Sequence, residues 1–175
     1  MLNNLRKRIA DAVEQGVLAR RRYYTSISLP DEQVLGDPCP PEIIQALEKA
    51  LDRPLPPSYR CFLELFNGWQ MVDGGVDLLS AHELLDGPKK QHISDWQTKM
   101  AYGGDEVAAR SLVIGVSTIT PTKYLLDPEM VNFDGEWQFV QHHNEVEAEI
   151  SSFLEWLEES IDEYNELATI DQDAS

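Results

Sequence analysis

The spacing of apolar residues predicts a helix at the start of the chain. Within residues 1–24, apolar side chains recur at steps of three or four residues and form one stripe, which consists of Leu2, Leu5, Ile9, Val13 and Val17. Arg20, Arg21 and Arg22 follow this stripe, where positive charge complements the C-terminal end of a helix dipole. We therefore expect an amphipathic helical arm over residues 1–24.

A similar pattern predicts a helix at the other end of the chain. Ser152 and Glu155 have the spacing of a capping box, in which each side chain bonds a backbone N–H of the other residue. The apolar face that follows contains Phe153, Trp156, Leu157, Ile161, Tyr164 and Leu167. The opposite face is almost entirely carboxylate, and residues 171–175 are expected to fray.

Two further helices are predicted between residues 41 and 67. Residues 41–51 begin with a proline, place apolar residues at helical steps and stop before Pro54. The second helix begins at Pro57 and ends at Asn67-Gly68, a pair that favours the left-handed backbone of a helix C-terminus. Its core face is expected to contain Tyr59, Phe62, Leu63 and Phe66.

The middle of the chain changes to the pattern of short strands and turns. Strands are expected at 69–72 and 76–79 around Gly74-Gly75, and later at 112–116, 123–126 and 137–141. Helical segments are expected after the Ser80–Glu83 capping box and over 88–102. This order predicts an α+β fold: a single domain with a mainly antiparallel central sheet flanked by helices, plus the N-terminal amphipathic arm. We assign residues 1–24 to the arm, 25–40 to a proline-rich connection and 41–170 to the domain.

Length and composition agree with one folded domain. The chain has 175 residues, of which 42% are hydrophobic, so it can bury a core without staples. Cys39 and Cys61 are too few for a disulfide framework or a zinc set. No signal peptide or apolar run approaching the roughly 20 residues of a membrane helix is present, so we expect a cytoplasmic protein without membrane contact.

Charge is distributed unevenly along the chain. The net charge is −17; residues 1–24 contain six basic and two acidic groups, whereas residues 124–175 contain 15 acidic groups and no Lys or Arg. Such a chain repels nucleic acid and anionic lipid and favours a basic partner. The arginine-rich arm could instead dock on the acidic body of its own chain or of a second copy, as in an arm-mediated homodimer.

The sequence contains no pattern that demands catalysis. Nucleotide-binding fingerprints are absent. His142 and His143 are adjacent on a predicted strand and would point to opposite faces, which argues against a metal site with Glu145. Cys61 is expected to pack as a buried hydrophobe, and Asp127 to cap the turn before Pro128. We expect no enzyme, no cofactor and no bound metal.

Short motifs in the chain resemble the SUKH superfamily. Residues 55–69, LPPSYRCFLELFNGW, are similar to the signature LP-x-x-[YF] followed by F-L-x-x-x-N-G. VDLL at 76–79, YLLD at 124–127 and SSFLEWLEES at 151–160 follow in the order of that family. The superfamily contains many immunity proteins of bacterial polymorphic toxin systems and the fungal cell-wall-assembly regulators.

The resemblance implies a non-enzymatic protein that binds and neutralises a cognate toxin, often a nuclease. The charge distribution favours a basic partner independently, and nuclease domains are commonly basic because they hold phosphates. The alternative is an intracellular scaffold or regulator related to the cell-wall regulators, with the arm recruiting a client. A protein that uses an Asp pair in a cleft for catalysis is a third hypothesis.

Six carboxylates in predicted turns and connections are the candidate contacts for a basic partner. Each could accept hydrogen bonds from Arg or Lys, although each could equally be a solvated turn residue. The six are Asp73, Asp77, Asp134, Glu136, Glu145 and Glu147.

Overall fold

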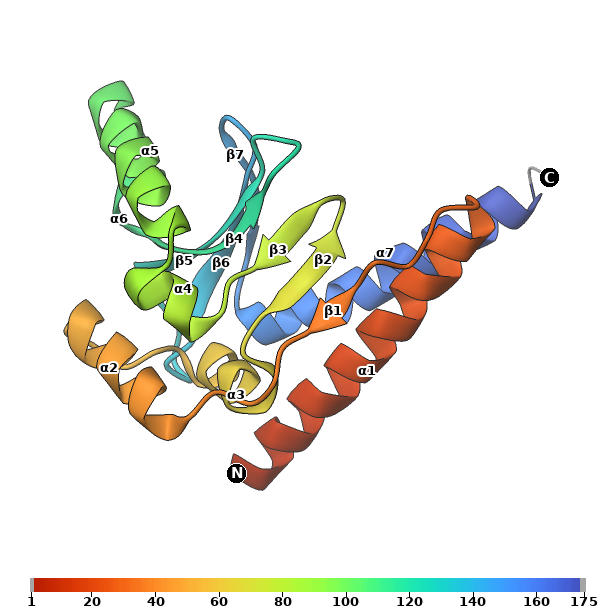
Figure 1. Cartoon of the computed structure of the whole chain (residues 1–175), viewed down its shortest axis with the longest axis horizontal. Helices are drawn as coiled ribbons and strands as arrows, with labels where there is room; N and C mark the ends of the chain where they lie inside the picture. The colour runs from red at the N-terminus through yellow and green to blue at the C-terminus, as the bar shows by residue number, and fades with distance from the viewer. Residues whose placement is uncertain (1, 174–175) are drawn as a thin grey trace.

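A computed structural model describes residues 2–173 of the chain (Figure 1). In this range the helices are α1 (Leu2–Ser26), α2 (Pro41–Leu51), α3 (Pro57–Phe66), α4 (Ala81–Asp86), α5 (Lys89–Gly103), α6 (Glu106–Arg110) and α7 (Phe153–Asp173). The strands are β1 (Val34–Leu35), β2 (Trp69–Asp73), β3 (Val76–Leu78), β4 (Leu112–Ser117), β5 (Lys123–Val131), β6 (Trp137–His142) and β7 (Val146–Ile150). They form the predicted α+β fold.

The seven strands form one antiparallel sheet in which every strand pairs with its neighbours in sequence. Tight connections between consecutive strands allow this arrangement, because antiparallel neighbours need only a short turn. Longer inserts occur at two points: α2 and α3 lie between β1 and β2, and α4, α5 and α6 lie between β3 and β4. Strand β7 is an edge strand that pairs only with β6.

The central strands are buried on both faces, because helices cover the sheet from two sides. The larger core joins α1, α3 and α7 to one face through residues that include Ile9, Phe62, Phe139 and Trp156. A smaller core on the other face contains Val113, Leu125 and Val140, with Ala108 of α6 and with Ile93, Trp96 and Met100 of α5 packed against it. Alternate residues of β4, β5 and β6 therefore enter different cores.

Local sequence explains where the helices begin and end. Pro41 and Pro57 occupy the first turns of α2 and α3, where a missing N–H is harmless. Asn67 has a left-handed backbone, with φ of 34°, and ends α3 as predicted. Ser80 and Glu83 form the predicted capping box of α4. At α7 the box is incomplete: Ser152 accepts from Glu155 N–H, but the Glu155 carboxylate bonds Ser151 instead.

Helix α1 lies along α7, and the two run in the same direction in Figure 1. Ile9 and Val13 are buried, and Leu5 and Val17 pack against the same core, so the apolar stripe over residues 5–17 forms part of the main core. The helix continues to Ser26 and contains no basic residue in its last turn. The prediction that Arg20, Arg21 and Arg22 lie at the C-terminal end of the helix and complement its dipole is therefore wrong, and Arg20 is fully buried.

Arg20 lies in a polar cluster that joins α1, β2 and α7. Its guanidinium group lies over the rings of Trp69 and Tyr164, with distances of 5.0 and 4.5 Å to the ring centroids. It donates hydrogen bonds to the Val72 carbonyl and, at 3.1 Å, to Ser160 Oγ. The hydrogen bonds to these acceptors and the two aromatic rings offset the cost of burying the Arg20 cation.

Three short elements were not predicted: β1, within the proline-rich segment, α6 and β7. Helix α7 extends to Asp173, and residues 174 and 175 of the tail predicted over 171–175 lie outside the described residues. In the described part of the chain, none of the helices is both long and apolar enough to span a membrane.

Candidate partner-binding groove

A groove lies between the N-terminal half of α1, the turn that joins β5 to β6, and the start of α7. Its volume is about 520 Å³. The lining contains four carboxylates and one arginine among twelve residues: Asn4, Leu5, Arg8, Pro57, Asn132, Asp134, Glu136, Ser151, Ser152, Leu154, Glu155 and Glu158. We call this feature the acidic groove.

The turn from β5 to β6 is held by its own asparagine. Asn132 Oδ1 accepts from the N–H groups of Asp134 and Glu136 at 2.9 and 3.1 Å. Asn132 N–H donates to the Glu136 carbonyl at 2.9 Å, and Gly135 N–H donates to the Asn132 carbonyl at 3.1 Å. Gly135 adopts a φ of 81°, which only glycine takes without strain. Asp134 is thereby presented to solvent at a fixed position.

Glu136 connects this turn to α3. Its carboxylate accepts from Ser58 N–H at 2.8 Å and from Ser58 Oγ at 2.7 Å. The side chain is largely buried, and this burial raises the pKa of Glu136, although the two bonds from Ser58 oppose the shift. The neighbouring charge of Asp134 adds to the increase in pKa. Glu136 therefore braces the turn against α3 and does not present an exposed charge to a partner.

The opposite wall of the groove combines α7 with α1. Glu155 is partly exposed and accepts from Ser151 N–H at 3.0 Å. Glu158 forms a two-oxygen pair with Arg8, whose Nη2 lies 2.8 and 2.9 Å from the two carboxylate oxygens. Arg8 thus offsets one carboxylate of the wall, whereas the lining shows no second basic residue for Asp134 and Glu155.

The other predicted contact residues lie elsewhere. Asp73 accepts from the hydroxyls of Tyr124 and Tyr164, beside the Arg20 cluster. Asp77 accepts from Met71 N–H at 3.0 Å and lies 3.4 Å from Lys89 Nζ. The fold therefore gives both aspartates partners within the chain.

Glu145 and Glu147 belong to the turn and strand after β6. Both are exposed, and Glu147 accepts from Gln141 Nε2 at 3.1 Å. Neither residue lines the acidic groove. Among the six predicted residues, only Asp134 and Glu136 lie together in the groove.

Sequence reasoning missed Glu155, Glu158 and Arg8 as groove residues. Glu155 was interpreted only as a capping residue, and Arg8 belonged to an arm whose docking position was unknown. The one available signal was the complementary charge of the arginine-rich arm and the acidic closing helix, which favoured docking of the arm on its own chain. The Arg8–Glu158 pair is a contact of this kind.

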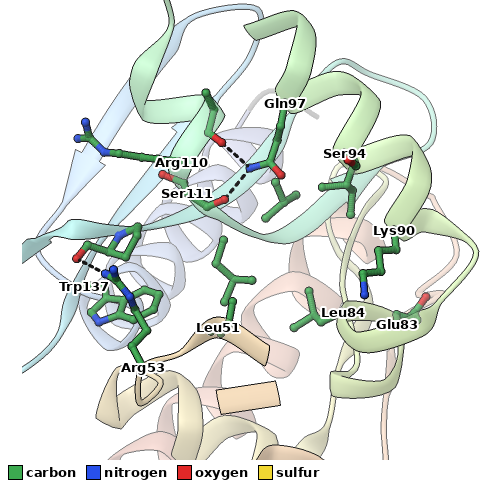
Figure 2. Close-up of a pocket in the computed structure, with 15 residues that line it drawn as sticks. Leu51, Arg53, Glu83, Leu84, Lys90, Ser94, Gln97, Arg110, Ser111 and Trp137 are labelled. Carbon is green, nitrogen blue, oxygen red and sulfur yellow. Dashed lines mark hydrogen bonds between the residues drawn. The ribbon is translucent and has the colours of Figure 1, made fainter. Parts of the chain in front are cut away.

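A second cleft, of about 460 Å³, lies between residues of the central strands β4, β5 and β6 and residues of α2, α4 and α5, and Figure 2 shows its lining. Arg53 donates to the Pro128 carbonyl at 3.0 Å, and Gln97 donates to the Ser111 carbonyl at 2.7 Å, as the dashed lines show. Arg110 points away toward Asp127, which it binds through two hydrogen bonds. Arg53, Gln97 and Arg110 therefore form hydrogen bonds to other residues of the same chain.

Metal-binding geometry is absent from the described residues, which contain no group of three or more His, Cys, Asp or Glu side chains able to hold an ion. His142 Nε2 lies 2.9 Å from Asp105 Oδ2, whereas His143 Nδ1 lies 2.8 Å from Thr122 Oγ1. The adjacent histidines therefore have different partners. Both cysteines are buried, and burial raises the pKa of the Cys61 thiol, which disfavours a nucleophilic thiolate.

Comparison with known proteins identifies the family of the chain. No curated protein matches it. The model of the SMI1 / KNR4 family (SUKH-1) matches residues 38–159, which include all helices and strands from α2 to β7 and the first third of α7. Helix α1 precedes the matched region, although it forms one wall of the groove. Because the match covers more than half of the chain and agrees with the fold, the chain belongs to the SMI1/KNR4 family, SUKH-1.

Proposed function

We propose that this chain is an immunity protein that binds a basic toxin in the cytoplasm and neutralises it by covering its functional surface. Family membership supports an immunity or regulatory role in general. The single observation that carries the finer proposal is the acidic groove, where four carboxylates from two distant segments surround one opening of about 520 Å³. Binding, rather than catalysis, is the activity proposed.

The chemistry of the groove suits lysine and arginine side chains. Asp134 is exposed on a fixed turn, and Glu155 lies across from it on α7. Carboxylates placed in this way accept charge-assisted hydrogen bonds, which are stronger than neutral ones. A toxin that acts on nucleic acid needs basic residues for phosphate contacts, and an acidic protein that covers them competes directly with the substrate.

The first experiment is co-expression with the protein encoded beside this chain's gene. The expected result is a purified complex in which the partner is basic and loses its toxic activity. Recovery of several signalling proteins, together with no binding of the neighbouring protein, would instead favour the regulator alternative. If the neighbouring protein does not bind, the immunity proposal is contradicted, whether or not signalling proteins are recovered.

Charge reversal then tests the groove. Asp134→Lys combined with Glu155→Lys changes two groove residues, and Asp162→Lys combined with Glu166→Lys changes the net charge equally on the exposed stripe of α7. We expect the groove pair to slow association with the toxin about tenfold more than the α7 pair, as is typical of charges at an interface. Equal effects would show that only the overall charge matters and would remove the groove from the interface.

A further inference from the structure

The turn beside the acidic groove exposes large apolar side chains. Phe133 is fully exposed at 104%, and Met130 and Val131 are 52% and 53% exposed. Phe133 has the highest exposure of any large apolar side chain in the described residues. Residues 129–136, which we call the β5–β6 hairpin, therefore place three apolar side chains in water rather than in the core.

The β5–β6 hairpin is braced at its tip and at its base. The Asn132 hydrogen bonds fix the tip, and the Glu136–Ser58 bonds tie it to α3. On the other side Arg53 donates to the Pro128 carbonyl, and its Nη2 lies 3.7 Å from Glu129 Oε1. A backbone held in this way loses little conformational entropy when a partner binds it.

The charges around Phe133 select among possible occupants. The exposed acidic side chains of the hairpin are Glu129 and Asp134, because Glu136 is buried, and the hairpin contains no basic residue. This charge opposes insertion into an anionic membrane and opposes contact between two copies of the same hairpin. It favours a surface that combines an apolar pocket with lysine or arginine around it.

We propose that Phe133 is the apolar anchor of the partner interface and enters a pocket on the basic toxin that is rimmed by Lys or Arg residues. The proposal rests on the proposed function and adds a binding element to the groove. Phe133 lies between Asn132 and Asp134 in the sequence, and both of these neighbours line the groove, so the anchor projects from the same turn as the groove wall. An aromatic side chain on a braced backbone, next to charged and polar residues, has the typical composition of an interface hot spot.

The test compares Phe133→Ala with Tyr102→Ala. Tyr102, on α5, is 90% exposed and is a matched control because its removal also deletes one solvent-exposed aromatic ring. The probe is the basic protein encoded beside this chain's gene. We expect Phe133→Ala to raise the Kd of its complex with this protein about 30-fold or more, mainly through faster dissociation. Tyr102→Ala is expected to leave Kd within about twofold. An increase in Kd of less than about threefold for Phe133→Ala contradicts the proposal.

Further measurements separate this proposal from its alternatives. Both variants should unfold at the denaturant concentration of the wild type, because neither ring is buried. If the wild type forms dimers that Phe133→Ala converts to monomers, the hairpin is a contact between copies and the proposal is overturned. Failure of the wild type to bind the toxin contradicts the proposed function itself. Normal toxin binding by Phe133→Ala contradicts only the assignment of the anchor.

Discussion

At the scale of single residues, Asp127 shows how the fold changes the meaning of a carboxylate. Its position before Pro128 suggested a turn cap, and Asp127 does accept from Glu129 N–H at 3.0 Å. The dominant contact is different: Arg110 donates two hydrogen bonds of 2.9 and 2.7 Å to this fully buried side chain. Burial alone would raise the pKa of Asp127, but the bonds from Arg110 and Glu129 hold it below its usual value.

We expect Asp127→Asn to lower the free energy of unfolding by about 2 kcal/mol near pH 7, because Arg110 loses a buried charged acceptor. A carboxyl whose folded pKa is depressed stabilises the fold above its unfolded pKa and loses this contribution as the pH falls. The difference between variant and wild type should therefore shrink below about pH 3.8. Urea titrations at both pH values check this, with the exposed Asp162→Asn as control. An equal loss at low pH would contradict the ionic origin.

Glu136 gives the opposite pH dependence. Its folded pKa is raised by burial, so its ionised form is disfavoured and stability is lost as the pH rises from about 4.5 through the folded pKa. Glu136→Gln retains an acceptor and a donor for Ser58 and stays neutral. We expect the variant to gain stability relative to the wild type between about pH 4.5 and pH 8, measured by thermal unfolding across that range. The exposed Glu147→Gln should show no such gain.

At the scale of elements, local signals predicted the long helices and the central strands correctly. In α3, the helical spacing of apolar residues, the proline at the start and the left-handed Asn67 at the end all indicate the same helix, and the observed bounds agree with them. The missed elements lack such agreement. Strand β1 has two residues, and α6 has five. Strand β7 carries Glu147 and Glu149 on an edge, where pairing with β6 rather than its own composition determines the strand.

The groove was only half predictable for a related reason. Asp134 and Glu136 lie in one turn, which the sequence shows directly. Glu155 and Arg8 join them only through packing of α7 and α1, and no local pattern reports a contact between residues 8 and 158. Phe133 followed Asn132 in a turn, and an aromatic residue in such a turn is the signal that sequence reasoning overlooked.

The attachment of α1 leads to a prediction for Arg20. Replacing Arg20 with Ala removes its stacking on Trp69 and Tyr164 and leaves the buried Val72 carbonyl without this donor. We expect a loss of about 3 kcal/mol in the free energy of unfolding. Arg22→Ala, which removes an exposed bond to Asn165, should cost less than about 0.5 kcal/mol. Chemical denaturation measures both, and similar losses would show that the buried cluster does not anchor α1.

At the scale of the whole molecule, the basic residues of α1 are largely engaged within the chain. Arg6 lies 3.4 Å from Glu64, Arg8 binds Glu158, and Arg21 lies 2.7 Å from Asp31. The first two contacts place positive charge beside α3 and the first half of α7. Within residues 2–173, the exposed stripe farther along α7, which includes Glu159, Asp162 and Glu166, forms no salt bridge. This stripe therefore carries negative charge that none of the salt bridges among the described residues offsets.

This charge distribution predicts that salt affects the association rate more than the dissociation rate. Charges act over a Debye length, which falls from about 10 Å to about 3 Å between about 0.1 and 1 M salt. We therefore expect the association rate with the basic toxin to fall about tenfold or more over this range, while the dissociation rate changes less than about threefold. Stopped-flow mixing measures the first rate and surface-immobilised toxin the second.

The apolar anchor should respond in the opposite way. Phe133→Ala removes no charge, so its association rate should retain the salt dependence of the wild type, while dissociation is faster at every salt concentration. The groove pair Asp134→Lys and Glu155→Lys should flatten the dependence of association on salt. If Phe133→Ala flattened it too, or if the groove pair left it unchanged, steering and anchoring could not be assigned to different parts of the surface. Separate responses would show that carboxylates bring the partner to the groove and that the ring holds it there.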